Sequence, residues 1–285
     1  MEKIKLIECP RDAMQGLHNF IETKDKIRYI NSLLQVGFDT LDVGSFVSPR
    51  MIPQMRDTPE VLNGINWEVS QTKLLTIVGN KKGASRAAEF EQVTYLGYPF
   101  SISETFQLRN TNASIEESLG RLADIREVCD EHHKSLVVYL SMGFGNPYGD
   151  SWSPSLVTEW TQRIKEDFSI EIISLSDTIG AADANTIRDV FESVKPYTKD
   201  IEVGAHLHAE VNRWKDKVEA ALHSGCVRFD GALKGLGGCP YAADDLKGNI
   251  PTELLIPYFE EEGYVTAIHR DKLSDAVRIS QEILN

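Results

Sequence analysis

The sequence predicts an α/β protein that folds as a (β/α)8 TIM barrel, and three observations support this prediction. Short apolar runs recur about eight times along the chain, and stretches with helical periodicity separate most of them. Such alternation produces βαβ units and a parallel sheet, and about eight units in roughly 250 residues fit a closed barrel better than an open sheet. The first run is also not followed by the GxGxxG turn of dinucleotide-binding sheets.

The expected strands are short and rich in β-branched or other apolar residues, which is typical of a parallel sheet buried on both faces. We expect them at residues 4–9, 38–44, 73–78, 92–97, 135–142, 171–176, 201–208 and 226–231.

Apolar residues spaced three or four positions apart predict amphipathic helices between these strands. The clearest stretches are residues 24–37, 114–133 and 155–167. Ser114 followed by Glu117 matches a capping box, which predicts that the second of these helices begins at Ile115. The polar stretch 107–118, which leads into this helix, is expected to be a long loop.

Composition and charge limit the classes of protein to be considered. The chain has 285 residues, 41% of them hydrophobic and 26% charged, which is ordinary for a globular protein. We expect one catalytic barrel domain over residues 1–285, with a C-terminal helical segment. The net charge of −13 repels nucleic acid and anionic membranes, so we expect neither as a partner.

The N-terminal sequence MEKIKLIECP lacks the uninterrupted apolar region of a signal peptide, and no later stretch approaches about 18 consecutive apolar residues. We therefore expect a cytoplasmic protein. Four cysteines without CxxC spacing are too few for a disulfide scaffold, and we expect three of them to be buried structural thiols. The four are Cys9, Cys129, Cys226 and Cys239.

Polar residues stand at the ends of several expected strands, where barrel enzymes carry their active sites. Arg11 and Asp12 follow the first strand, Asp42 lies in the second, and His206 and His208 end the seventh. Side chains two apart in a strand share a face, so both imidazoles point the same way. Together with a carboxylate they would suit Mg, Mn, Co or Zn, although satisfied core histidines remain the alternative.

A glycine-rich run, KGLGGCPYA at residues 234–242, follows the eighth strand. Its glycines permit sharp bends and close approach to a ligand, so we expect a mobile loop. The loop carries Cys239, whose thiol would be either a proton donor near a cation or an inert loop cysteine.

The motifs PRDAMQG, LDVGSFVSPRMIPQM, SLSDTIG, AHLHA and GLGGCPYA, in this order, resemble those of hydroxymethylglutaryl-CoA lyases. The resemblance runs from the first strand to about Glu253 and implies a TIM barrel with a bound Mg²⁺ or Mn²⁺. It also implies cleavage of 3-hydroxy-3-methylglutaryl-CoA to acetyl-CoA and acetoacetate, a reaction of leucine degradation and ketone-body formation. The implied partner is an acyl-CoA substrate, with a homodimer as a further expectation.

The resemblance also assigns roles to residues. The implied metal ligands are Asp12, His206, His208 and Asn249. The implied catalytic residues are Arg11, Asp12, Asp42, His206 and Cys239, and the implied substrate-binding residues are Arg11, Gln15 and Glu253. A guanidinium suits the thioester oxygen, where negative charge develops as the carbon–carbon bond breaks. Asp12, an imidazole or a metal-bound water is expected to take the hydroxyl proton, and Cys239 to return a proton to the enolate.

The sequence departs from the family pattern near the expected substrate. Ala13, Gly16 and Leu17 replace Gly, Asn and Glu, Asp42 replaces Glu, and Val137 stands where the family has Arg. These changes leave open another hydroxyacyl-CoA, a Claisen-type condensing enzyme acting on a keto acid, or a non-catalytic acyl-CoA-binding barrel. Retention of the four ligand types together with the arginine argues against loss of activity.

Overall fold

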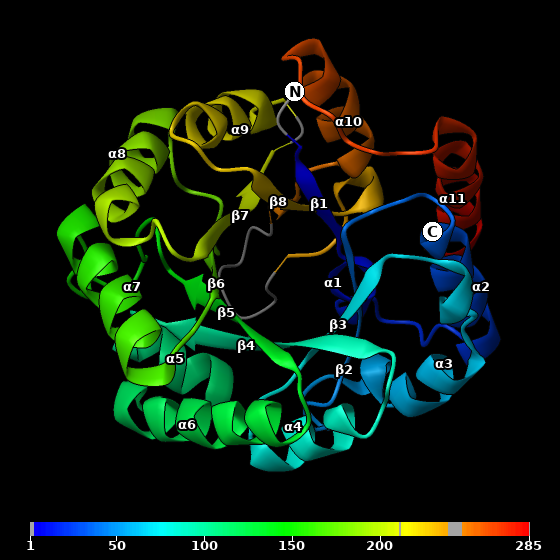
Figure 1. The fold of residues 1–285 in the computed structure, drawn as a ribbon, viewed down its shortest axis with the longest axis horizontal. Coiled ribbons are helices and arrows are strands. Elements are labelled where there is room, and N and C mark those ends of the chain that lie inside the picture. Colours follow the sequence, from blue (N-terminus) through cyan, green and yellow to red (C-terminus); the bar gives the residue numbers. More distant parts are fainter. Residues whose placement is uncertain (1–2, 211, 239–246, 285) are drawn as a thin grey trace.

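Eight parallel strands close into a barrel in the computed structural model, which describes residues 3–210, 212–238 and 247–284. Each strand pairs with its neighbour in the sequence, and pairing of β1 with β8 completes the ring (Figure 1). This confirms the predicted (β/α)8 barrel. The strands are β1 (Lys5–Glu8), β2 (Thr40–Ser45), β3 (Lys73–Ile77), β4 (Val93–Ser101), β5 (Ser135–Ser141), β6 (Ile172–Asp177), β7 (Glu202–Ala209) and β8 (Arg228–Gly231).

Helices surround the ring of strands (Figure 1). They are α1 (Pro10–Gln15), α2 (Thr23–Leu34), α3 (Thr58–Gly64), α4 (Lys81–Ala88), α5 (Glu104–Thr111), α6 (Ile115–Glu131), α7 (Pro154–Phe168), α8 (Ala184–Val194), α9 (Trp214–His223), α10 (Thr252–Glu261) and α11 (Arg270–Ile283). Four 3-10 turns, η1 (Pro53–Met55), η2 (Trp67–Val69), η3 (Lys195–Tyr197) and η4 (Leu233–Gly235), lie between them. In the described residues no helix is long and apolar enough to cross a membrane.

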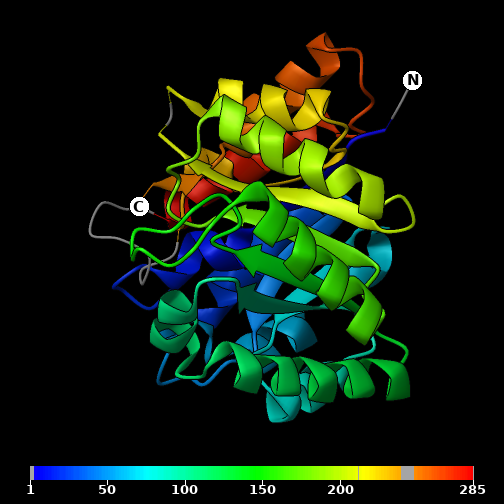
Figure 2. The same ribbon diagram turned by 90° about the vertical axis from the view of Figure 1, so that its left-hand side faces the viewer.

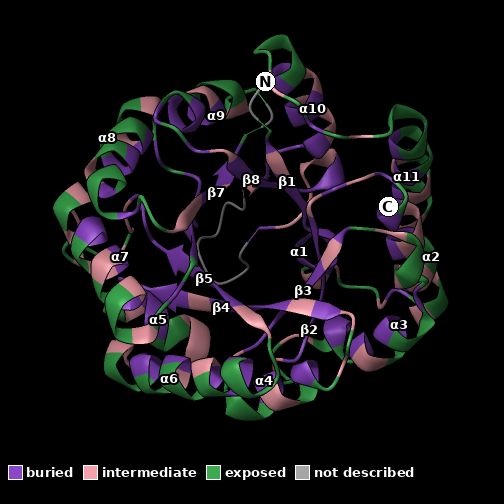
Figure 3. Ribbon diagram, viewed as in Figure 1, coloured by how far each residue is buried: buried purple, intermediate pink, exposed green. Residues whose placement is uncertain are grey.

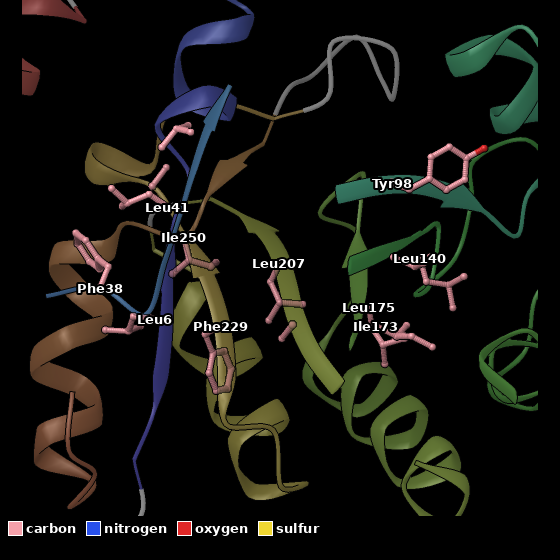
Figure 4. Packing of buried hydrophobic residues seen from close by; sticks show 14 of the residues in the cluster. Leu6, Phe38, Leu41, Tyr98, Leu140, Ile173, Leu175, Leu207, Phe229 and Ile250 are labelled. Carbon is pink, nitrogen blue, oxygen red and sulfur yellow. The ribbon is translucent and has the colours of Figure 1, made fainter. Parts of the chain in front are cut away.

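The main hydrophobic core lies between the barrel and the helices. Outward side chains of the strands, such as Leu6, Leu207 and Phe229, pack in this layer (Figure 4). Figure 3 shows the consequence: the strands and the inner faces of the helices are buried, while the outer faces of the helices are exposed. Burial of one stripe on helices such as α2, α6 and α7 explains why their periodicity is visible in the sequence.

Helix α6 begins at Ile115, as predicted, because both halves of the capping box form. The expected loop at residues 107–118 is wrong, however, since α5 extends to Thr111. The Ser103 side chain caps this helix by accepting a hydrogen bond from the N–H of Phe106. The buried Gln107 then joins α5 to Ser101 and Ser118, so polar tertiary contacts, not an apolar stripe, hold this helix.

A ninth, two-residue strand, β9 (Gly248–Asn249), pairs antiparallel with β7 so that Asn249 lies opposite His208. The C-terminal helix α11 packs beside α2, where Arg28 and Glu282 form an ion pair. In the side view α1 and α5 lie at one end of the barrel, the end toward which the strands run (Figure 2). Residues predicted to carry chemistry therefore gather at this carboxyl end.

Candidate metal centre and active site

A cavity of about 610 Å³ opens at the carboxyl end of the barrel. Its polar lining includes five of the predicted site residues: Arg11, Asp12, Gln15, His206 and His208. The rest of the wall mixes apolar and polar side chains, which come from β3 to β6 and from the segments that follow β2, β3, β4 and β6. Large concave sites with a few convergent polar groups are the usual form of small-molecule sites.

Helix α1 places Arg11 in this cavity because it begins directly after β1, with Pro10 in its first turn. Arg11 is 8% exposed, and its guanidinium donates from Nε to Asp42 Oδ2 at 2.9 Å, with a second bond from Nη2 to the same oxygen. Its Nη1 donates to Asp12 Oδ1 at 2.9 Å and to Gln15 Oε1 at 2.8 Å. Asp42, on β2, therefore fixes the position of Arg11 and does not itself line the cavity.

Asp12 is buried and accepts hydrogen bonds at both carboxylate oxygens. Oδ1 accepts from Arg11 and from Gln15 Nε2, and Oδ2 accepts from Asn249 Nδ2 at 2.6 Å and from the N–H of Gly238. Burial would raise the pKa of Asp12, but the charges of Arg11 and the two histidines hold it well below its usual range. Asp12 is thus an ionised carboxylate whose orientation is fixed by hydrogen bonds.

His206 and His208 point to the same side of β7, as predicted, with ring centroids 5.0 Å apart. His206 Nδ1 lies 2.9 Å from Asp230 Oδ2, and His208 Nδ1 lies 3.1 Å from the carbonyl oxygen of Thr178. Burial lowers the pKa of His206, but the hydrogen bond and charge of Asp230 together outweigh it, so the net shift is upward. The pKa of His208 falls to about 4 through burial and the neighbouring His206.

The residues present fit a divalent metal ion. One ligand atom each from Asp12, His206 and His208 lies within 4.8 Å of the others. His208 Nε2 and Asn249 Oδ1 are buried without a hydrogen-bond partner in the described part of the chain, although buried polar atoms are normally satisfied. Because His208 Nδ1 contacts a carbonyl, it carries the proton and Nε2 keeps its lone pair. Two acceptors thus lie in the site without a partner.

Asn249 reaches this site through backbone geometry. Its pairing with β7 brings it beside His208, and its Nδ2 donates to Asp12 and to the carbonyl of Leu236. A Cβ on Gly237, whose φ is +98°, would lie 2.5 Å from Asn249 Nδ2 and 2.7 Å from Asp12 Oδ2. The glycine therefore allows the backbone to lie directly against the Asp12–Asn249 pair.

A second group of metal-ligating side chains, Cys9, His206 and Asp230, lies just below the first. Here Nδ1 of His206 is already hydrogen-bonded to Asp230. Burial and the nearby carboxylates raise the pKa of the Cys9 thiol well above its usual value, which opposes formation of the thiolate ligand. The first group is therefore the better metal site.

Glu253 and Cys239, also predicted for the site, are not among the described residues that line the cavity. Glu253 does not line the cavity, and its carboxylate accepts the N–H of Lys234 at 3.0 Å, so its contact with substrate stays a prediction. Cys239 lies outside the described residues. Of the other cysteines, Cys9, Cys129 and Cys226 are buried free thiols, as expected.

The departures at the start of α1 have modest local effects. Ala13 is buried, Leu17 packs against the core, and a Cβ on Gly16 would meet open space. Val137 has a clearer effect, because it is buried inside the barrel in an apolar cluster with Ile77 and Tyr139. Ile77 and Tyr139 also line the cavity, so this wall of the site is apolar.

Asp230 was not predicted from the sequence, and Thr178 stood out only as a polar residue at the end of the sixth strand, although these two residues orient the histidine rings. Asp230 could have been found, since it stands in the eighth expected strand, beside the seventh. The Thr178 carbonyl gave no signal, because a backbone acceptor carries no sequence information. Such outer partners fix the tautomer and orientation of metal-binding histidines.

Comparisons with known proteins agree with this site. The HMGL-like family model matches residues 3–281. A curated lyase of Pseudomonas aeruginosa, named for 3-hydroxy-3-isohexenylglutaryl-CoA and hydroxy-methylglutaryl-CoA, is 34% identical over 88% of this chain and 83% of its own length. The rat cytoplasmic 3-hydroxy-3-methylglutaryl-CoA lyase is 35% identical over 96% of this chain and 79% of its own length.

Among solved structures, an HMG-CoA lyase of Acinetobacter baumannii in complex with coenzyme A and 3-methylmalate has a TM-score of 0.90 and 31% identity, covering 99% of this chain and 91% of its own. The match of the family model over nearly the whole sequence and the relatives at 34% and 35% identity lead to one assignment. The chain belongs to the HMGL-like family.

Proposed function

We propose that this protein is a divalent-metal-dependent lyase that cleaves 3-hydroxy-3-methylglutaryl-CoA to acetyl-CoA and acetoacetate. The observation that carries the proposal is the convergence of Asp12, His206, His208 and Asn249 beside Arg11, with two buried acceptor atoms lacking partners. The names of the curated relatives support the reaction. Both relatives are named as lyases, which favours cleavage over a condensing enzyme or a non-catalytic barrel.

The proposed metal is Mg²⁺ or Mn²⁺, held by one carboxylate, one amide oxygen and two imidazoles. When bound, it would acidify the C3 hydroxyl of the substrate and orient that hydroxyl and the neighbouring carboxylate. The depressed pKa of Asp12 favours its role as a ligand over that of a proton acceptor. His208, neutral near pH 7 because its pKa is about 4, is a ligand of the type that metals need.

Arg11 stabilises the negative charge that develops on the thioester oxygen. A guanidinium has five N–H donors, and Asp42, Asp12 and Gln15 accept four of them in the described structure. The remaining N–H is on Nη2, and Arg11 lines the cavity, so this donor is available to the substrate. Three fixed acceptors pre-organise the guanidinium before the substrate arrives, which is the condition for electrostatic catalysis.

Cleavage breaks the C2–C3 bond after the hydroxyl proton leaves. The electrons of the O–H bond form the ketone of acetoacetate, and those of the C2–C3 bond form the enolate of acetyl-CoA. A proton must then reach C2 of the enolate. We assign this step to the thiol of Cys239, the role that the family resemblance implies for it. His206 donates from Nδ1 to Asp230 and faces the metal site with its other nitrogen, so it has no lone pair for the first proton, and we assign uptake of that proton to a water molecule in the cavity.

We propose that the cavity receives the acyl end of an acyl-CoA. Gln15 lines the cavity, which supports the proposal that its amide contacts the substrate carboxylate. Glu253 supports the site from outside, since its carboxylate holds the N–H of Lys234 at the start of the glycine-rich run. The coenzyme A complex of the Acinetobacter relative supports an acyl-CoA substrate here.

The proposal is tested by measuring release of acetoacetate from 3-hydroxy-3-methylglutaryl-CoA by the purified protein, with Mg²⁺, with Mn²⁺ and with a chelator. Release that depends on added metal supports the proposed reaction. The isohexenyl analogue named for the Pseudomonas relative is the comparison substrate. Absence of release from either substrate, in protein that binds Mn²⁺, contradicts the proposed reaction and leaves the metal centre in place.

Cellular location and oligomeric state complete the proposal. The name of the rat relative supports a cytoplasmic location, which cell fractionation would test. The predicted homodimer stays a prediction, and a solution mass compared with the 31.9 kDa of one chain decides it.

A further inference from the structure

Charged side chains alternate inside the barrel along β7 and β8, which lie side by side (Figure 1). Gly204 of β7 pairs with Arg228 of β8. The order from the bottom of the barrel toward the cavity is Glu202, Arg228, Asp230 and then His206. Arg228 has no part in the proposed mechanism.

Arg228 is a costly residue in this position. It is 1% exposed, and only Nη1 has a partner, Glu202 Oε1 at 2.8 Å. Its Nε and Nη2 are buried without a hydrogen-bond partner among the described residues. Burial of an incompletely paired charge destabilises a fold, so Arg228 is poorly explained as a stabilising residue.

The barrel interior has room for this side chain because β7 has a glycine opposite it. A Cβ on Gly204 would lie 3.0 Å from Arg228 Cδ and 3.4 Å from Ser174 Oγ. Lys5 adds a second positive charge at the bottom by pairing with Glu202. Lys5, Glu202 and Arg228 together therefore carry a net positive charge beneath Asp230.

Asp230 is the group that this positive charge faces. Its side chain is 1% exposed, Oδ2 is bonded to His206 Nδ1, and Oδ1 is buried without a partner among the described residues. Burial lowers the pKa of Arg228, but the charge of Asp230, the largest opposing influence, helps to raise it above its usual value. In a low-dielectric interior such an attraction acts without a direct hydrogen bond.

We propose that Arg228 is a positioning residue that acts through Asp230: its charge holds the carboxylate in place as the acceptor for His206 Nδ1, so that the opposite nitrogen of His206 faces Asp12 and His208. The proposal rests on the proposed role of His206 as a metal ligand. Outer partners of this kind change metal affinity by about 10–100-fold.

The test compares Arg228→Met, which keeps the length but removes the charge, with Arg228→Lys, which keeps the charge. Mn²⁺ affinity is measured by electron paramagnetic resonance on the full chain. We expect Arg228→Met to weaken Mn²⁺ binding about tenfold and Arg228→Lys to retain most of it. Asp230→Asn should weaken binding as well, and adding Arg228→Met to it should cause no further loss, because Arg228 acts through Asp230.

Two controls separate positioning from general destabilisation. Glu202→Gln removes the negative charge of the other partner of Arg228 and should leave Mn²⁺ affinity unchanged. Lys26→Met removes a buried cation paired with Asp57 outside the barrel interior, so it should lower the melting temperature without changing Mn²⁺ affinity. The proposal would be overturned if Arg228→Met bound Mn²⁺ as tightly as wild type. It would also be overturned if Arg228→Met weakened Mn²⁺ binding as much in the Asp230→Asn variant as in wild type.

A second measurement distinguishes this proposal from the proposed function. In metal-free protein with ¹⁵N-labelled histidine, Arg228→Met should shift the ring nitrogen signals of His206 and leave those of His208 in place. If these shifts appear in protein that does not bind Mn²⁺, Arg228 positions His206 and the proposed metal function is wrong. If the signals of His206 do not move, Arg228 has no positioning role.

Discussion

Asn249 donates its side-chain N–H to Oδ2 of Asp12 at 2.6 Å, across 237 residues of the chain. The Asn249 amide therefore has two features that matter for the site. Its nitrogen fixes the Asp12 carboxylate, and its buried oxygen, which has no partner in the described structure, is free to accept. The pair joins α1, the helix that follows β1, to β9 and forms one side of the proposed metal centre.

Replacing Asn249 by alanine should weaken Mn²⁺ binding by at least about 10-fold, because it removes an oxygen ligand and the donor to Asp12 together. Titration calorimetry measures the effect. The exposed Asn185 on α8 supplies the control variant Asn185→Ala, which should bind Mn²⁺ normally. Equal affinity of the two variants would exclude Asn249 from the site.

Arg11→Gln should lower kcat by about 100-fold to 1000-fold, since it removes a charged donor to the thioester oxygen. Arg11→Lys should have a kcat almost as low as that of Arg11→Gln, because an ammonium cannot bridge Asp42, Asp12 and substrate as the planar guanidinium does. Acetoacetate release measures kcat, and Mn²⁺ binding is measured in parallel. A variant with normal turnover would contradict the role given to Arg11.

Metal removal should lower stability as well as activity. An ion that binds only the folded chain stabilises it by about 2.7 kcal/mol at a concentration of 100 times Kd. We therefore expect the melting temperature to rise with added Mn²⁺ and to fall again with a chelator. His208→Ala, which lacks the buried Nε2, should show a much smaller rise. An equal rise in the variant would place the ion elsewhere.

Stability should depend on pH through Glu8, a buried carboxyl on β1 that accepts from the N–H of Leu233 and from Thr252. Burial raises the pKa of Glu8 from 4.5 to about 8. Between these values the folded chain holds a proton that the unfolded chain has lost, so this contribution is present at low pH and is lost as pH rises. The test is urea unfolding of wild type and Glu8→Gln at about pH 5 and about pH 8. The free energy of unfolding should fall more between these pH values in wild type than in the variant, and an equal fall in both would contradict this prediction.

Lys217→Met should lower the free energy of unfolding by about 3–5 kcal/mol, because it leaves the carboxylate of Asp177 buried without its partner. Lys217 Nζ donates to Asp177 Oδ2 at 2.6 Å and to the carbonyls of Gly180 and His208. The exposed pair of Lys165 and Asp200 supplies the control, and Lys165→Met should cost about 1 kcal/mol or less. Similar losses for the two lysine variants in urea unfolding would show that burial is not the cause.

The sequence predicted the barrel because strand alternation and amphipathic helices are local patterns that burial imposes. It failed at α5, where Ser103 and Gln107 hold a helix through polar contacts with other segments. It also missed β9, since two residues paired with a distant strand leave no periodic pattern.

The site was predictable in part for a similar reason. The positions of Asp12, His206 and His208 at strand ends, and the two-residue spacing of the histidines, predicted that these three side chains meet. Asn249 was predicted only from the family resemblance. Asp230 and Arg228 were missed because their roles depend on which side chain of a neighbouring strand they face. That relationship is set by register between β7 and β8, which composition does not reveal.

The pairing of Asn249 with Asp12 also bears on how the chain acquires its ion during synthesis. A growing chain has Asp12 from the start, but the fourth donor emerges from the ribosome only after all eight strands have been made. With the proposed ligand set, a nascent chain that still lacks Asn249 has only three of the four donors. Metal binding would therefore stabilise the finished barrel rather than an earlier fragment.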